Sequence, residues 1–124
     1  MTQIEKQSLW IKQQRSKVLA SVNKVVSILF LHNLNLPDNA RYGINLDIST
    51  SGNDIDIRIY DMINDNALVE HIEHYCLSSI FNNRYSYSFA FDEKEIGKNV
   101  DQFLVKMKDT KRIISKYSKL NLIK

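Results

Sequence analysis

The segment EHIEHYC, at residues 70–76, holds the residue types that could bind a metal or form a nucleophile–base pair. His71, His74 and Cys76 are typical zinc ligands, but a structural zinc site needs about four ligands, and the sequence has no second Cys/His pair. Cys76 also falls on the apolar side of the helix predicted for this segment, where a thiol behaves as a small hydrophobic group. We therefore predict no metal site and no cofactor.

Catalysis by Cys76 would require an exposed thiol that a neighbouring base activates. The sequence offers no local signature of this kind, and its three glycines leave little material for a phosphate-binding loop. A serine nucleophile elbow is also absent from the sequence. We predict no catalytic residues, and hence a protein that is not an enzyme.

A row of basic residues lies near the C-terminal end of the sequence and could bind phosphates. The spacing i, i+4, i+8, i+11 places these residues on one side of a predicted helix. They are Lys108, Arg112, Lys116 and Lys119. A solvated face of an amphipathic helix has the same pattern, so nucleic-acid binding and a purely structural role both remain open.

Residues 42–61 show the alternation of apolar and polar side chains that is typical of two half-buried strands. With a two-residue turn at Ser51 and Gly52, all the apolar side chains fall on the same side of the hairpin. The facing apolar pairs in this register are Ile48–Ile55, Leu46–Ile57 and Ile44–Ile59.

The same register sets Asn45 opposite Arg58 and Asp47 opposite Asp56 on the outward side of the hairpin. Opposed like charges cost a strand pair about a few tenths of a kcal/mol. The hairpin therefore carries either an acidic recognition patch for a partner with a basic surface, charge that has no function, or a weak divalent-cation site. The residues predicted to contact a protein partner are Asp47, Asp54, Asp56, Arg58 and Tyr60.

The remaining elements follow from apolar periodicity and capping residues. Helical spacing predicts a helix over residues 4–31, a second one over residues 65–80 begun by Asp65 or Asn66, and a last one that begins at Asp92. Alternating aromatic residues predict a strand over 85–91. The 124 residues thus form one α+β domain (1–124) in the order α-β-β-α-β-α, with helices packed on a three-stranded, mainly antiparallel sheet.

The N-terminal residues and the cysteine content bear on the compartment. The first ten residues lack the apolar region of a secretory signal, and the most apolar run, VVSILFL, is too short to span a bilayer. One cysteine cannot form an intramolecular disulfide. We expect a cytoplasmic protein with no membrane span.

Residues 10–92 resemble the C-terminal domain of TonB and TolA proteins. In that family a hairpin with a glycine turn, here Gly52, leads to a helix introduced by a segment like Asn66-Ala67-Leu68. The resemblance implies a non-catalytic docking module of the periplasm that often adds a strand at a sheet edge. This chain departs from the family by its basic final helix and by the lack of an anchor in the sequence given.

These observations favour a non-enzymatic protein-binding module, and a small bacterial inhibitor or immunity protein that neutralises a toxin fits them best. The first alternative is an envelope docking domain like that of TolA or TonB. The second is a nucleic-acid binder that uses the basic final helix.

Overall fold

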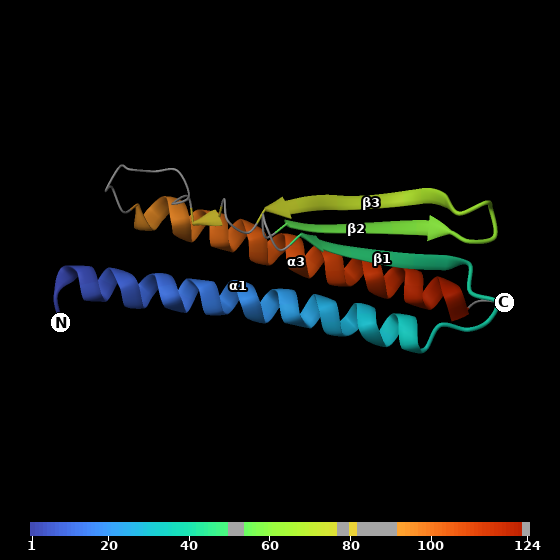
Figure 1. Ribbon diagram of the computed structural model, residues 1–124, viewed down its shortest axis with the longest axis horizontal. Coiled ribbons are helices and arrows are strands. Elements are labelled where there is room, and N and C mark those ends of the chain that lie inside the picture. The colour runs from blue at the N-terminus through green and yellow to red at the C-terminus, as the bar shows by residue number, and fades with distance from the viewer. Residues whose placement is uncertain (50–53, 77–79, 82–91, 123–124) are drawn as a thin grey trace.

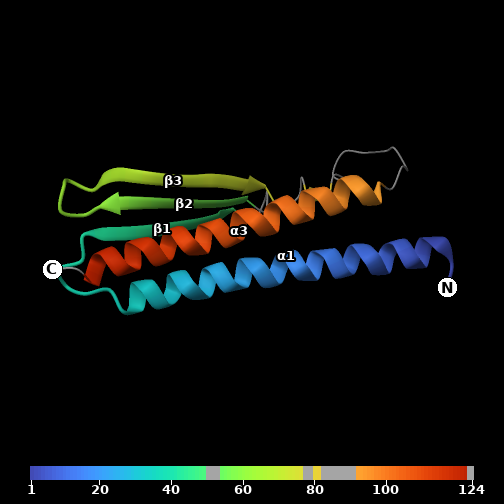
Figure 2. The ribbon, with the colours of Figure 1, turned by 180° about the vertical axis from the view of Figure 1, so that it is seen from behind.

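Two long helices and a three-stranded antiparallel sheet form two layers (Figures 1 and 2). The computed structural model describes residues 1–49, 54–76, 80–81 and 92–122, with only the backbone described at 73–76. The elements are α1 (Gln3–Leu34), β1 (Tyr42–Ser49), β2 (Asp54–Asp61), β3 (Ala67–Cys76) and α3 (Glu93–Leu122). The strand order β1-β2-β3 places β2 at the centre.

Both helices begin at the capping residues that their sequences supply. The Thr2 hydroxyl accepts the Glu5 N–H at 3.1 Å to start α1, and the Asp92 carboxylate accepts the Glu95 N–H at 3.1 Å to start α3. Most of the apolar residues predicted to line the buried faces are buried, but Ile11 and Val26 are only half-buried and Leu19 is 60% exposed. The buried ones are Val18, Val22, Val25 and Leu29 of α1, and Ile96, Val100, Phe103, Met107, Ile114 and Tyr117 of α3.

The β1–β2 register is the predicted one. Ile44, Leu46 and Ile48 lie opposite Ile59, Ile57 and Ile55. Ile57 and Ile59 have no exposed surface, because β2 is the central strand and the helices cover its inner side. The turn predicted at Ser51 and Gly52 lies outside the described residues.

The helix predicted over residues 65–80 is wrong, because Ala67–Cys76 forms β3, antiparallel to β2. Asp65 and Asn66 have φ angles of 53° and 55°, which is a left-handed turn conformation and not a helix start. The Ala67 N–H donates to the Asn64 carbonyl at 3.0 Å and closes this turn. The chain therefore folds back as a hairpin.

Two irregularities in β3 explain why its sequence did not read as a strand. The β2–β3 register shifts between Ile55 and Ile57 and again between Ile59 and Tyr60, so the period of two is interrupted twice. Opposite the buried Ile59 stands Glu70, which accepts a hydrogen bond from the Tyr117 hydroxyl at 2.6 Å. Because a carboxylate occupies a position that faces the helices, the sequence of β3 lacks the regular alternation of apolar and polar residues.

The α+β class, with helices packed on a three-stranded antiparallel sheet, is confirmed, and the order in the described residues is α-β-β-β-α. The third strand is β3, and the strand predicted over 85–91 lies outside the described residues. Ile80 and Phe81 are buried in the core cluster. Neither α1 nor α3, as described, has an apolar stretch long enough to cross a membrane.

Asp61 closes the β2–β3 turn. Its Oδ1 accepts the N–H groups of Ile63 and Asn64 at 3.2 Å each, and its Oδ2 accepts from Arg41 at 2.8 Å. The Arg41 hydrogen bond, assisted by the turn N–H groups, holds the pKa of this carboxyl below its usual value, although burial acts in the opposite direction.

Candidate functional site

The face of the sheet turned away from the helices, here called the outer face, is covered by no described helix (Figures 1 and 2). Polar side chains of β1 and β2 lie on it. Asp47 of β1 lies directly opposite Asp56 of β2, and Asn45 lies opposite Arg58, as predicted. Asp47 is exposed and Asp56 is half-buried. The structure therefore does bring two carboxylates together across the strand pair.

The guanidinium of Arg58 and the imidazole of His71 both contact the Asp56 carboxylate. Arg58 Nη2 lies 3.2 Å from Asp56 Oδ2, and His71 Nε2 of β3 donates a hydrogen bond to Asp56 Oδ1. The side chain of Asp56 is 16% exposed, against 45% for Arg58 and 43% for His71. Asp56 is thus held inside a three-residue cluster, and Asp47 presents the open negative charge on this part of the outer face.

The other two predicted partner-binding residues lie at opposite ends of β2. Asp54 is half-buried at its start and already interacts within the molecule. Tyr60, near its end, is half-buried between Gly43 of β1 and Leu68 of β3. It lines a hollow of about 480 Å³ together with Asn45, Asn66 and four other residues. The five predicted residues therefore extend along the whole strand, and only Asp47, Asp56 and Arg58 form a compact group.

His71 belongs to this group but was not among the residues predicted for the site. The predicted helix placed His71 near His74, whereas β3 places it opposite Arg58 and beside Asp56. Asp65 and Asn66 were the signal that could have found it, since Asp and Asn are the residues besides glycine that tolerate a left-handed turn. A hairpin at that point would have put His71 on the outer face.

The four basic residues of the predicted phosphate-binding stripe are all exposed on α3. They are Lys108, Arg112, Lys116 and Lys119. Two of them have partners on the same helix: Arg112 donates to Asp109 at 3.0 Å, and the Lys116 ammonium lies 5.2 Å from the Tyr117 ring centroid. The four basic residues are therefore exposed on α3 as predicted, and an acidic residue, Asp109, lies among them.

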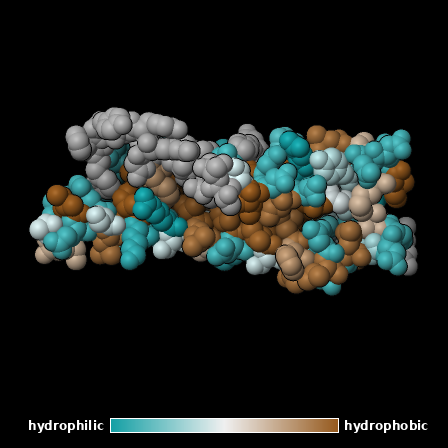
Figure 3. Space-filling view, viewed as in Figure 1, coloured by the Kyte–Doolittle hydropathy of each residue, from teal (hydrophilic) through white to brown (hydrophobic). Residues whose placement is uncertain are grey.

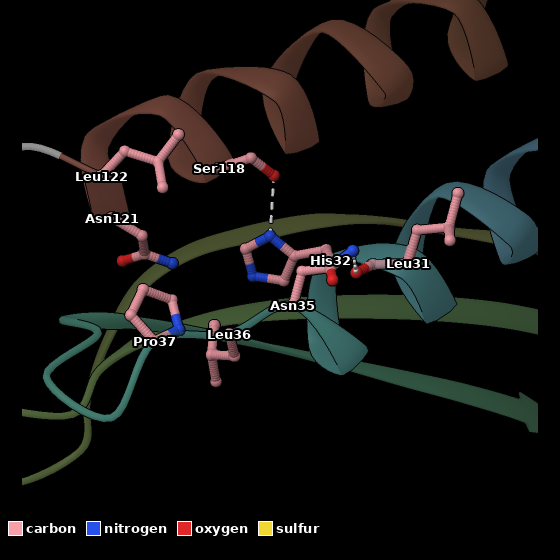
Figure 4. A pocket seen from close by; sticks show the side chains of 8 residues that line it. All are labelled: Leu31, His32, Asn35, Leu36, Pro37, Ser118, Asn121 and Leu122. Atoms are coloured by element: carbon pink, nitrogen blue, oxygen red, sulfur yellow. Dashed lines mark hydrogen bonds between the residues drawn. The ribbon is translucent and has the colours of Figure 1, made fainter.

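A second hollow, of about 240 Å³, lies where the last turns of α1 and α3 meet the Leu36–Pro37 loop (Figure 4). His32 Nδ1 and Ser118 Oγ form a 2.7 Å hydrogen bond across it. Asn121, on the same side, accepts the Tyr42 N–H at 2.8 Å and donates to the Tyr42 carbonyl at 2.9 Å. The first contact joins the ends of the two helices, and the other two join the end of α3 to the edge of β1.

The His32–Ser118 pair has the spacing of a base and a nucleophile, so its surroundings decide its chemistry. Burial lowers the pKa of His32, while the Tyr42 backbone acts in the opposite direction, and no described carboxylate is among the causes. The Asn35 amide donates to the Leu31 carbonyl, and both polar atoms of the Asn121 side chain bind Tyr42. Each of these side-chain amides therefore makes hydrogen bonds that hold the fold.

Metal binding finds no support in the part of the chain that the structure describes, where no group of three or more His, Cys, Asp or Glu side chains could hold an ion. The side chains of Glu73, His74 and Cys76 lie outside that part.

Comparisons with protein-family models, with curated proteins and with solved structures find no match to this chain.

Proposed function

We propose that this protein is a non-enzymatic binding module that docks on a protein partner through the outer face of its sheet. The observation that carries the proposal is the contrast between the two opposed carboxylates. Arg58 and His71 bind the Asp56 carboxylate within the fold, whereas Asp47 stays exposed on a face that no described helix covers.

This charge arrangement favours a partner with a basic surface. A cation of the partner placed near Asp47 would be attracted to a carboxylate that makes no ion pair within the described fold. Complementary charge of this kind raises the rate of association more than it strengthens the final complex. A small bacterial inhibitor or immunity protein that neutralises a toxin would work in this way, by covering a surface of its target.

The test compares two charge reversals of the same type. Wild-type protein, Asp47→Lys and the control Asp101→Lys, which changes an exposed residue of α3, are immobilised and exposed to lysate of the source organism. A protein retained by the wild type and the control but lost from Asp47→Lys supports the proposal. With that protein purified, Asp47→Asn should slow association and reduce its salt dependence. Equal retention by all three proteins contradicts docking at the outer face.

A second candidate is strand addition at the edge of β1 that no described strand pairs with, as in the TolA and TonB domains that the sequence resembles. The 2.6 Å hydrogen bond from the Met62 N–H to the Arg41 carbonyl fixes which residues of β1 direct their backbone N–H and C=O groups toward β2, because these residues alternate along an antiparallel strand. In this arrangement the N–H and C=O groups of Ile44, Leu46 and Ile48 point away from β2. At Tyr42, the first outward position, Asn121 already occupies the edge.

Proline at position 46 separates the two docking modes. It removes only an outward N–H, so it should leave the β1–β2 hydrogen bonds in place. Leu46→Pro should abolish binding by strand addition and leave outer-face docking unchanged, provided that its thermal unfolding shows an intact fold.

Nucleic-acid binding by α3 is a third candidate, supported by the exposure of all four basic residues on one helix face. It predicts retention on DNA or RNA that falls steeply with salt and is reduced in Lys108→Gln/Lys116→Gln. We expect only weak binding at low salt, because Asp109 already pairs with Arg112.

A further inference from the structure

Helix α1 carries a second row of residues on the side that does not face the core. Ser16, Ala20, Asn23, Ser27, Phe30 and Leu34 follow one another at steps of four, three, four, three and four, and all six are exposed. This is the spacing of the contact seam between two packed helices. We call it the outer stripe.

The C-terminal half of the outer stripe is strongly apolar. Phe30 is 64% exposed and Leu34 70%, and the flanking Leu19 and Leu31 are 60% and 58% exposed. Hydrophobic residues gather over this half of α1 in Figure 3. Between Leu19 and Leu34 the sequence has one formal charge at neutral pH, on Lys24, with His32 buried. An apolar surface of this kind marks an interaction site.

The order of side-chain sizes along the outer stripe makes it complementary to itself. The N-terminal half has the small residues Ser16 and Ala20, and the C-terminal half has the large residues Phe30 and Leu34. If two copies pair antiparallel about a centre near residue 25, Phe30 meets Ala20 of a second copy and Leu34 meets Ser16 of a second copy. Large side chains then fill the space left by small ones at both ends of the contact, while Asn23 meets Ser27 of the second copy near its centre.

Charge selects the antiparallel direction. The N-terminal half of α1 has Lys6, Lys12, Arg15 and Lys17 against one acid, Glu5, so a parallel pair would set these cations side by side. In the antiparallel pair Lys12 comes level with the C-terminal end of the other α1. The last carbonyls of that helix and the exposed Asp38 beyond it supply negative charge there.

The area is sufficient for a specific contact. With roughly 150–250 Å² for each large side chain, Leu19, Phe30, Leu31 and Leu34 expose on the order of 450 Å² per copy. A two-fold contact then buries about 1,000 Å² in total with the small residues included, which is the size at which specific interfaces begin.

We propose that the outer stripe of α1 is the interface between two copies of this chain, packed antiparallel about a two-fold axis near residue 25. The outer face of the sheet stays open in this dimer, since the stripe lies on the helix layer. The proposal is therefore independent of the proposed function.

Sedimentation equilibrium tests the interface with a matched pair of variants. Phe30→Glu places a charge in the seam, while Val105→Glu makes a similar change at a 60% exposed residue of α3. We expect a dimer with a micromolar dissociation constant for the wild type and for Val105→Glu. Phe30→Glu should weaken it by about a hundredfold or more, because it buries an unpaired charge within the contact.

Spin-label distances test the direction. In a Cys76→Ser background, Gln13→Cys and Lys24→Cys place labels at exposed positions beside the outer stripe. At 1.5 Å rise per residue, the antiparallel pair separates the two labels at position 13 by about 36 Å along the axis, and those at position 24 by about 3 Å. A parallel pair gives short distances at both positions.

A wild type that stays monomeric at hundreds of micromolar overturns the proposal, as does a dimer that Phe30→Glu leaves intact or a pair with short distances at both labels. A monomer that binds lipid vesicles or another protein through Phe30 also overturns it and assigns the outer stripe to that occupant.

Discussion

Replacing Asn121 by alanine tests how the end of α3 is fastened to β1. Asn121 is 7% exposed, and its amide satisfies the N–H and the carbonyl of Tyr42 at 2.8 and 2.9 Å. Asn121→Ala removes both hydrogen bonds at once. Each is worth about 1 kcal/mol net, and the stranded backbone groups add somewhat to this, so the loss is about 2–3 kcal/mol.

Alanine partly offsets this loss because it is the better helix former by about 0.5 kcal/mol. The free energy of unfolding should therefore fall by about 2 kcal/mol. For a domain of this size, that lowers the melting temperature by about 8 °C.

The assay is urea unfolding followed by circular dichroism, with amide exchange at Tyr42 measured by NMR. Ser115→Ala is the control, because Ser115 is exposed on the same helix and gains a comparable helix propensity. We expect the control to change stability by less than about 0.5 kcal/mol. An Asn121→Ala protein as stable as the control, with unchanged exchange at Tyr42, would refute the claim that this side chain secures the edge of β1.

Two pH dependences follow from groups with shifted pKa values. The Arg41 hydrogen bond lowers the pKa of Asp61, so the stability it contributes is present above the usual carboxyl value of 3.8 and is lost as the pH falls through the lowered value. Thermal melts from pH 6 to 2 should show the gap between wild type and Asp61→Asn closing below about pH 4, and a constant gap would contradict this. Burial and the hydrogen bond to Glu70 raise the pKa of Tyr117 to about 12, so the stability it contributes is present below about pH 10 and is lost as the pH rises toward 12. In an absorbance titration of the six tyrosines, one should ionise late in the wild type, and Tyr117→Phe should lack that step.

The helices and the first hairpin could be predicted because several independent signals agree in them. In α3 the capping residue Asp92 and the apolar stripe from Ile96 onward specify the same helix. In the first hairpin the alternation on β1 and that on β2 agree with one register, which correctly placed Asp47 opposite Asp56.

Strand β3 was not predictable by the same means, because its two register shifts break the alternation and Glu70 occupies a helix-facing position. Its apolar residues Val69 and Ile72 are three apart and so imitate a helix. Because of this error His71 was not among the predicted site residues, and its contact with Asp56 was not predicted.

Contacts between segments that lie far apart in the chain could not be predicted from the sequence either. His32 and Ser118 are 86 positions apart, and nothing local in either helix indicates that they meet.

The long separation between α1 and α3 along the chain has a consequence for biosynthesis. When a ribosome has released α1, the helix α3 that completes its core does not yet exist, and the buried face of α1 stays uncovered while β1, β2 and β3 are made. The strands pair with their immediate neighbours in sequence, so the sheet can assemble while translation continues. Val18, Val22 and Leu29 meanwhile stay open to any chaperone that binds apolar nascent segments. Completion of folding therefore awaits release of the C-terminal helix, and a chain stopped before residue 93 should be bound by chaperones or degraded.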